Sequence, residues 1–339
     1  MKVNDFFYNL PEYLIAQTPL EERPSSRLLV VNRNNKQLID DKFYSLLNYL
    51  TDNDVLVFNN TKVLQSRIYG RKVSTGASIE FLLLNEQKPF WQVLARPGRR
   101  LKPNDLVDFS GLMQAKIIDK QEEGKFLVSF IYQGIFLEIL EKLGRVPLPP
   151  YIHEELKDES RYQTVYANHL GSAAAPTAGL HFDGKLLEKI AERNIERIFL
   201  TLHIGLGTFR PVNVDVVEEH KMHEEHYEIT EEAAFALNNA IKKGKRIIAV
   251  GTTVTRVLES AINSNGIITA QKGSTNIFIY PGYNFSVVDA LITNFHLPKS
   301  TLLMLVSAFY NRINILEVYE YAIKQEYRFF SFGDAMFII

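Results

Sequence analysis

The stretch RIIAVGTTVTRVLESAI, residues 246–262, decides the fold of this chain. RIIAV is a short apolar run typical of a buried β-strand, and TTVTRVLESAI has the pattern of a helix. Gly251 stands between the two, so the strand passes directly into the helix. A strand that leads at once into a helix is the repeating unit of a parallel sheet covered by helices.

The same alternation continues on both sides, from Tyr151 to the end of the chain. GKLLEKIAERNI, residues 184–195, has an amphipathic helical pattern, and the IERIFLTLHI run that overlaps its end is typical of a buried strand. Thr230 is a suitable N-cap for a helix that Gly244 ends. ALITNF, STLLMLVSAFY, ILEVYEYAIKQEY and FFSFGDAMFII continue the series as strand, helix, helix and closing strand. We predict an α/β fold: a three-layer α/β/α main domain with a mostly parallel sheet.

Residues 62–150 differ from the rest, because they hold closely spaced strand patterns and no histidine. Gly, Pro and Asn separate these patterns, as in small barrels and sandwiches. We predict a small all-β barrel, inserted into a discontinuous α/β catalytic domain of residues 1–61 and 151–339. The patterns are SRIYGRKV, ASIEFLLL, FWQVLAR, LVDFSG, MQAKIIDK and KFLVSFIY.

The composition is that of an ordinary globular protein. Of the 339 residues, 46% are hydrophobic and 23% are charged, and the formal net charge of −1 gives no general basic field for nucleic acid. No apolar run approaches the ~20 residues that span a bilayer, and the N-terminus lacks the apolar core of a signal peptide. The absence of cysteine excludes disulfides and cysteine nucleophiles. We expect a cytoplasmic monomer that does not contact membranes.

The stretch YANHLGSAAAPTAGLHF, residues 166–182, is nearly all small residues, and we call it the small-residue stretch. With few side chains in the way, its backbone N–H groups can approach a ligand closely. His169 and His181 add acid–base capacity near neutral pH. A surface loop or a tightly packed segment is the alternative interpretation.

Three further segments end a strand with glycine or small polar residues. Ligands bind beyond the carboxyl ends of the strands in an open α/β sheet, and free N–H groups at a helix N-terminus bind anions. We therefore expect the three segments to share one crevice, although ordinary β–α turns are the alternative. The polar or glycine residues at these strand ends are His203, Gly205, Gly207 and Thr208, then Thr252 and Thr253, then Asn294 and His296.

The segment HKMHEEHYEI suggests a metal site, because His220, His223 and His226 are spaced by three and could share a helix face. The H-E-x-x-H spacing is absent, so we predict no metal and expect a polar wall whose glutamates meet a cationic substrate. A metal-dependent hydrolase that uses these histidines stays as one alternative. A non-catalytic RNA-binding protein is the other, since basic clusters such as Arg96, Arg99 and Arg100 permit RNA contact.

Together these motifs resemble one family, the S-adenosylmethionine:tRNA ribosyltransferase-isomerases of queuosine biosynthesis. The resemblance runs nearly end to end, from LPEYLIAQTPLEERPSSRLLV at residues 10–30 to YRFFSFGDAMFI at residues 327–338. It implies that the ribosyl part of S-adenosylmethionine is transferred and isomerised onto 7-aminomethyl-7-deazaguanine at the tRNA wobble position. Epoxyqueuosine forms, and adenine and methionine are released. S-adenosylmethionine would be a co-substrate, with no bound cofactor.

The chemistry of that reaction gives each group of residues a hypothetical role. The sulfonium acidifies the C5′ protons, so a base must remove one; the substrate amine must be neutral to attack; and adenine leaves with a proton. The residues expected to be catalytic are His169, His181 and His203 for proton transfer, with Asp183 and Glu225 for the amine. The residues expected to bind substrate are Arg23, Arg27, Thr177, Gly179, Gly205, Gly207, Thr208, Thr252, Thr253, Asn294, His296 and Asp334.

Overall fold

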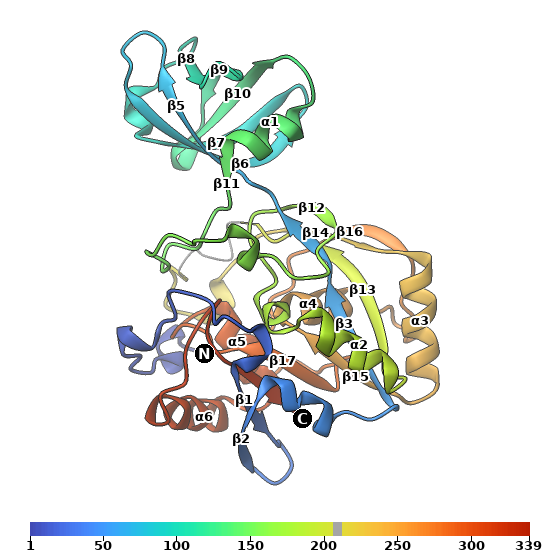
Figure 1. The fold of residues 1–339 in the computed structure, drawn as a ribbon. Coiled ribbons are helices and arrows are strands. Elements are labelled where there is room, and N and C mark those ends of the chain that lie inside the picture. Colours follow the sequence, from blue (N-terminus) through green and yellow to red (C-terminus); the bar gives the residue numbers. More distant parts are fainter. Residues whose placement is uncertain (206–211) are drawn as a thin grey trace. The chain divides into compact units, whose positions relative to one another are not determined.

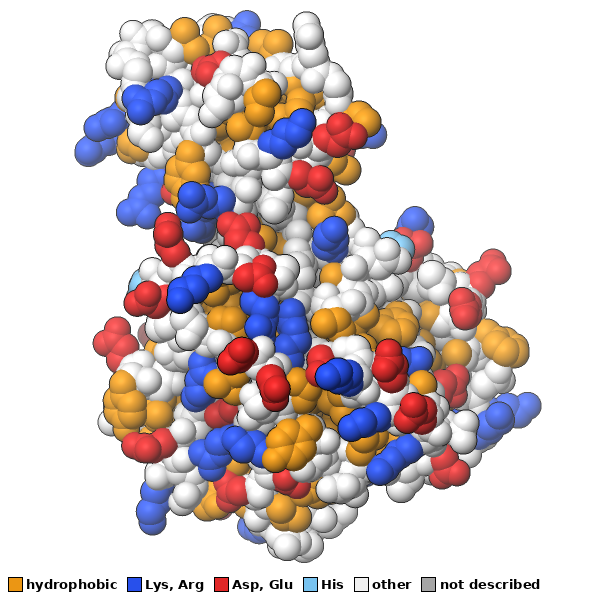
Figure 2. Space-filling view, viewed as in Figure 1, with side chains coloured by type: hydrophobic (Ala, Val, Ile, Leu, Met, Phe, Trp, Pro, Cys, Tyr) orange, Lys and Arg blue, Asp and Glu red, His pale blue; other side chains and the backbone are white. Residues whose placement is uncertain are grey.

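The structure, a computed structural model, describes residues 1–205 and 212–339. The chain divides into two compact units (Figure 1). The first combines Met1–Lys62 with Pro149–Ile339, and the second is Val63–Leu148. On the face shown in Figure 2, lysine and arginine side chains are interspersed with aspartate and glutamate rather than gathered into one basic surface. In the described part of the chain, every helix is too short or too polar to cross a membrane.

A mixed nine-stranded sheet forms the centre of the first unit. Its strands lie in the order β16 (Gln271–Thr275), β14 (Glu225–Ile229), β13 (Glu196–Leu202), β3 (Asp54–Asn59), β15 (Arg246–Val250), β17 (Ala290–Asn294), β18 (Ala335–Ile338), β1 (Arg27–Val31) and β2 (Leu38–Lys42). The neighbours from β13 to β17 are parallel, as are β18 and β1, whereas the other pairings are antiparallel. The sheet is therefore parallel in its centre and mixed as a whole.

The direction of β18 has a simple cause. Two helices, α5 (Thr301–Phe309) and α6 (Arg312–Lys324), lie between β17 and β18. A single helix would carry the chain from the carboxyl end of β17 back to its amino end, and the next strand would then run parallel to β17. A second helix carries the chain across the sheet again, so that β18 begins at the carboxyl end of β17. The closing strand consequently runs antiparallel to β17.

Helices and short turns cover both faces of the sheet, which gives the expected three layers. Along β3, Val55 and Val57 belong to one apolar cluster, while Leu56 and Phe58 belong to another. Alternate residues of a strand point to opposite faces, so a strand with two apolar faces is buried between two layers. The first cluster includes residues of α3 (Glu231–Lys242), α4 (Thr252–Ala261), α5 and α6, and the second includes residues of α2 (Gly184–Glu192) and η4 (Phe43–Tyr49).

The ends of α3 agree with the sequence pattern. Thr230 accepts a hydrogen bond from the backbone N–H of Ala233 at 3.2 Å, and Gly244 follows the helix with a φ of 65°. Short 3-10 helices and a two-stranded ladder complete the first unit. They are η1 (Val3–Phe6), η2 (Glu12–Leu14), η3 (Arg23–Ser25), η7 (Glu159–Tyr162), η8 (Thr177–His181) and η10 (Val217–Glu219), with β4 (Thr61–Val63) paired to β12 (His169–Ser172).

The second unit is the expected all-β barrel. Its strands follow the order β5 (Arg67–Lys72), β6 (Ser78–Gln87), β7 (Phe90–Arg96), β10 (Lys125–Tyr132), β9 (Met113–Lys120) and β8 (Leu106–Phe109), with β11 (Gly144–Arg145) added beside β5. Pairing of β5 with β8 closes the barrel. Gly70 is required at this seam, because a Cβ there would lie 2.6 Å from the carbonyl oxygen of Asp108. The unit also holds α1 (Phe136–Leu143), η5 (Gly98–Arg100) and η6 (Glu122–Gly124).

Candidate active site

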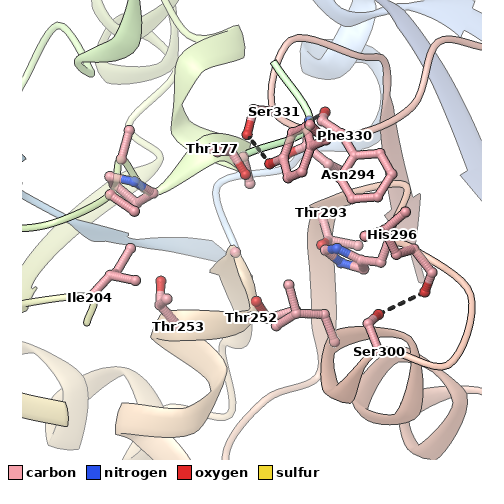
Figure 3. Close-up of a pocket in the computed structure, with 18 of the residues that line it drawn as sticks. Thr177, Ile204, Thr252, Thr253, Thr293, Asn294, His296, Ser300, Phe330 and Ser331 are labelled. Atoms are coloured by element: carbon pink, nitrogen blue, oxygen red, sulfur yellow. Dashed lines mark hydrogen bonds between the residues drawn. The ribbon is translucent and has the colours of Figure 1, made fainter. Parts of the chain in front are cut away.

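A cavity of about 560 Å³ lies at the carboxyl ends of the parallel strands in the first unit (Figure 3). Ile204 after β13, Gly251 after β15 and Asn294 at the end of β17 all line it. Ala174 to Ala178 of the small-residue stretch form another part of the wall. Of the residues predicted to bind substrate, those that line this cavity are Thr177, Thr252, Thr253, Asn294 and His296.

The first turns of α4 form one wall of the cavity. Gly251, with a φ of 100°, turns the chain from β15 into the helix, a conformation that side chains disfavour. Arg256 follows Thr252 by four positions and Thr253 by three, so it lies on the same side of α4 as each of them, and all three residues line the cavity. The hydroxyl of Thr253 is buried and lacks a hydrogen-bond partner among the described residues.

Arg256 is one of the cavity residues that the sequence interpretation missed, along with Tyr151, Lys299 and Phe330. Its side chain is buried, and its Nη1 donates to the carboxylate of Glu225, which is itself buried. Nε donates to the carbonyl of Ile277 at 3.3 Å, while Nη2 has no partner in the described part of the chain. The sequence does contain a pattern that could have identified Arg256: it lies four positions after Thr252 and three after Thr253, and both threonines were predicted to line the crevice.

Asn294 connects the cavity to a buried histidine. Its side-chain nitrogen donates to the carbonyl of Phe330 at 3.0 Å and lies 3.1 Å from Nε2 of His181. Its Oδ1 is buried and makes no hydrogen bond to any residue that the structure describes. The other ring nitrogen of His181 lies 2.8 Å from the hydroxyl of Ser26.

Burial lowers the pKa of His181 to about 3, and the positive charges of Arg23 and Arg328 act in the same direction. The imidazole is therefore neutral at pH 7. Because the amide nitrogen of Asn294 donates to Nε2, the hydrogen-bond network assigns the ring proton to Nδ1, which donates to Ser26. His181 lies behind the cavity wall rather than in it.

His296 is the histidine that lines the cavity itself (Figure 3). Its Nε2 lies 2.8 Å from the hydroxyl of Thr293, and burial lowers its pKa to about 3. Its backbone is fixed on both sides, since its N–H donates to the hydroxyl of Tyr319 at 3.0 Å and its carbonyl accepts from Tyr8. The cavity thus holds a neutral, firmly positioned imidazole.

The structure does not bring the three predicted acid–base histidines together. His203 lines a different groove with His226, and its Nδ1 lies 2.8 Å from the hydroxyl of Thr61. Burial lowers the pKa of His203, as do the neighbouring His169 and His226. Ile204 lines the cavity, whereas its neighbour His203, also just after β13, lines the other groove. His169 is exposed on β12.

The two predicted carboxylates have structural partners. Asp183 caps α2 by accepting a hydrogen bond from the backbone N–H of Leu186 at 2.7 Å. Glu225 pairs with Arg256 and accepts from the N–H of Gly205 at 3.3 Å. Glu225 therefore reaches the cavity only through Arg256.

The guanidinium groups of Arg23 and Arg27 contact other residues of the protein. Arg23 donates to the carbonyls of Gln163 at 2.8 Å and Leu180 at 3.1 Å. Arg27 pairs with Asp40 at 3.0 Å and lies 3.6 Å from the centre of the Tyr327 ring. Neither residue lines the cavity, because these contacts occupy the guanidinium groups.

Asp334 and Gly179 also lie outside the cavity lining. The carboxylate of Asp334 accepts from the backbone N–H groups of Arg27 at 2.7 Å and Arg328 at 2.8 Å, and burial raises its pKa. Gly179 packs beneath Tyr166, whose hydroxyl would lie 2.0 Å from an added Cβ. Gly207 and Thr208 fall outside the described residues.

The shared helix face suggested for His220, His223 and His226 does not exist. His226 lies on the extended strand β14, and the two earlier histidines precede that strand outside any helix. Within residues 1–205 and 212–339, no three His, Asp or Glu side chains come together to hold a metal ion. The histidine-based metal hydrolase is therefore unsupported.

Comparison with known proteins identifies the family of this chain. The family described as "Queuosine biosynthesis protein" matches residues 3–338. The crystal structure of an S-adenosylmethionine tRNA ribosyltransferase from Thermotoga maritima is 35% identical in sequence, with a TM-score of 0.58. The alignment covers 99% of this chain and 100% of that chain. Since the family match includes both units and every strand that lines the cavity, the chain belongs to the queuosine biosynthesis protein family.

Proposed function

We propose that this protein is an S-adenosylmethionine:tRNA ribosyltransferase-isomerase. It moves the ribosyl part of S-adenosylmethionine onto 7-aminomethyl-7-deazaguanine at the wobble position of a tRNA in the cytoplasm, and adenine and methionine are released. Family membership supports this reaction. The observation that carries it is the cavity of about 560 Å³ at the strand ends, a volume typical of small-ligand sites, with buried polar atoms that lack partners.

The cavity offers different surfaces to the two ends of S-adenosylmethionine. We propose that Thr252 and Thr253, at the N-terminus of α4, face the methionine carboxylate, because free N–H groups there attract an anion. The rings of Tyr151 and Phe330, whose centroids are 4.4 Å apart, form an apolar wall suited to adenine. The unpartnered Oδ1 of Asn294 can accept a hydrogen bond from the nucleoside.

The proton transfers need groups that reach the reacting atoms. His296 is the imidazole that lines the cavity, so we propose that it takes a proton from the ligand. His181 would act through Asn294, which it holds in place. His169 and His203 line no part of this cavity, and a role for either would require substrate that reaches the groove of His203 or the exposed strand of His169.

The test is incubation of the purified protein with S-adenosylmethionine and tRNA that carries the deazaguanine precursor. Adenine and methionine should appear in equal amounts, together with epoxyqueuosine in the digested tRNA. Treatment with a chelator should leave the rate unchanged, because we propose that S-adenosylmethionine is consumed as co-substrate without a resident metal. Folded protein that binds tRNA but releases neither product would refute the assignment in favour of an RNA-binding protein.

A further inference from the structure

Arg256 is the most unusual side chain of the cavity. A guanidinium carries five N–H donors and is charged at any physiological pH. Only 5% of this residue is exposed, yet its Nη2 makes no hydrogen bond within the described part of the chain. A buried charged group that lacks a partner is costly, so such groups are normally satisfied by a bound ligand or by water. Arg256 lines the cavity, so a ligand there can supply the missing acceptor.

The charges around the cavity indicate which kind of acceptor is missing. The charged residues among the described lining are Arg256 and Lys299, and no aspartate or glutamate belongs to it. The carboxylate of Glu225 bonds to Nη1 of Arg256, and Nη2 has no partner among the residues that the structure describes. The unpartnered hydroxyl of Thr253, one helical turn before Arg256, is a second donor on the same side of α4. Two donors on one helix side suit an anionic group that offers two oxygens, such as the carboxylate of an amino acid.

We propose that Arg256 anchors the carboxylate of the amino-acid part of the ligand, with the Thr253 hydroxyl as second donor. Glu225 is a positioning residue, because it holds the guanidinium through Nη1 and does not itself line the cavity. This inference rests on the proposed function for the identity of the ligand, S-adenosylmethionine. It makes Arg256 the residue by which the cavity distinguishes an amino acid from a plain adenosyl sulfonium.

The test changes the ligand before it changes the protein, because removal of Arg256 would leave the carboxylate of Glu225 buried and unpaired. Calorimetry measures the binding of S-adenosylmethionine and of decarboxylated S-adenosylmethionine to the wild-type protein without tRNA. The second compound keeps the adenosyl group and the sulfonium and lacks only the carboxylate. A lost charge-assisted hydrogen-bond pair should weaken binding roughly 10- to 100-fold. Equal affinity for the two compounds would overturn the proposal.

Variants then assign the discrimination to Arg256. In the variant Arg256→Gln, S-adenosylmethionine and its decarboxylated form should bind with nearly equal affinity. The same should hold in the double variant Glu225→Gln/Arg256→Gln, which leaves no unpaired buried carboxylate. Glu225→Gln should weaken binding of S-adenosylmethionine while binding of the decarboxylated compound stays constant, and Arg256→Lys should keep part of the discrimination. If the folded double variant still prefers the carboxylated compound by the wild-type factor, Arg256 is not the anchor.

Arg246 supplies the matched control. It forms an ion pair with the buried carboxylate of Asp54 at 2.6 Å, in the same unit but away from the cavity. Arg246→Gln should lower stability and leave the ratio of the two affinities unchanged. Turnover with precursor tRNA separates the two proposals. Discrimination in binding without product formation would refute the proposed function alone, whereas product formation without discrimination would refute only the anchor.

Discussion

The side-chain nitrogen of Asn294 lies 3.1 Å from Nε2 of His181, and this contact joins a fully buried histidine to the wall of the cavity. Since burial lowers the pKa of His181 to about 3, the ring cannot supply a proton near pH 7. His181→Gln should therefore reduce S-adenosylmethionine binding and turnover together, by roughly tenfold, through a displaced Asn294 amide. Steady-state kinetics from pH 5 to 9 checks this.

The pH profile separates positioning from proton transfer for His181. A positioning residue leaves the inflections of the kcat profile where they are in the wild-type protein. Asn294→Ala should resemble His181→Gln, and the double variant should be little worse than either single one, since both remove the same contact. A loss of about 100-fold in kcat with a vanished inflection would instead make His181 a general acid–base.

Substitutions of Asp183 distinguish a helix-capping role from a catalytic role. Its carboxylate caps α2 through the N–H of Leu186, and asparagine caps a helix as well as aspartate does. Asp183→Asn should leave both stability and turnover near wild type, whereas Asp183→Ala should cost about 1 kcal/mol of unfolding free energy. Urea denaturation and initial rates measure the two effects. A large loss of turnover in a stable Asp183→Asn variant would restore a role with the substrate amine.

Local sequence patterns predicted the parts of the fold that depend on local chemistry. The apolar run before Gly251 and the threonines after it place a strand end and a helix start within a few residues, and the structure has both there. The direction of β18 depends on which strands it pairs with, and pairing order is a tertiary property. The sequence pattern predicts the two helices before β18 but not that β18 pairs with β17, the strand before them, to which it runs antiparallel.

The site was harder to predict for a physical reason. Sequence position shows which strand end a residue occupies but not which pocket its side chain lines. The sequence therefore could not show that Ile204, and not His203, lines the cavity. Arg256 looks like an ordinary solvated arginine of an amphipathic helix. Its buried charge is paired with Glu225, which lies 31 positions earlier on β14, and no local sequence pattern predicts that pairing.

Gly179 and Gly184 test how tightly the small-residue stretch is packed. A Cβ at Gly179 would lie 2.0 Å from the hydroxyl of Tyr166, whereas one at Gly184 would meet no atom within 4 Å. Gly179→Ala should therefore cost about 1–3 kcal/mol of stability, as overpacked cores do. Gly184→Ala, in the first turn of α2, should be neutral or slightly stabilising.

Thermal unfolding of the two glycine variants measures the difference, and a second substitution assigns its cause. Tyr166→Phe removes the hydroxyl oxygen that an alanine at position 179 would meet, so it should recover part of the lost stability in the Gly179→Ala background. If Gly179→Ala is as stable as Gly184→Ala, Tyr166 moves aside at little cost and the packing at Gly179 is looser than the distance of 2.0 Å indicates.

The buried histidines His181 and His296 should make the protein sensitive to mild acid. Burial lowers the pKa of each to about 3, while in the unfolded chain a histidine titrates near its ordinary value of 6.5. Below pH 6.5 the unfolded chain binds protons that the folded protein does not, so stability falls as the pH decreases from about 6.5 toward 3. Each histidine contributes a slope of up to about 1.4 kcal/mol per pH unit. Above pH 6.5 neither contributes, because both forms are neutral.

Urea unfolding at pH 7, 6 and 5 measures this slope. His296→Gln should be less stable at pH 7, because it disturbs the contact with Thr293. Its unfolding free energy should nevertheless decrease less steeply as the pH falls, because unfolding of the variant takes up about one proton fewer. His153→Gln is the control, since that side chain is exposed and its loss should leave the slope unchanged. An unaltered slope in His296→Gln would mean that His296 takes up a proton in the folded protein. The imidazole that lines the cavity could then also deliver a proton to the leaving adenine, instead of only accepting one from the ligand.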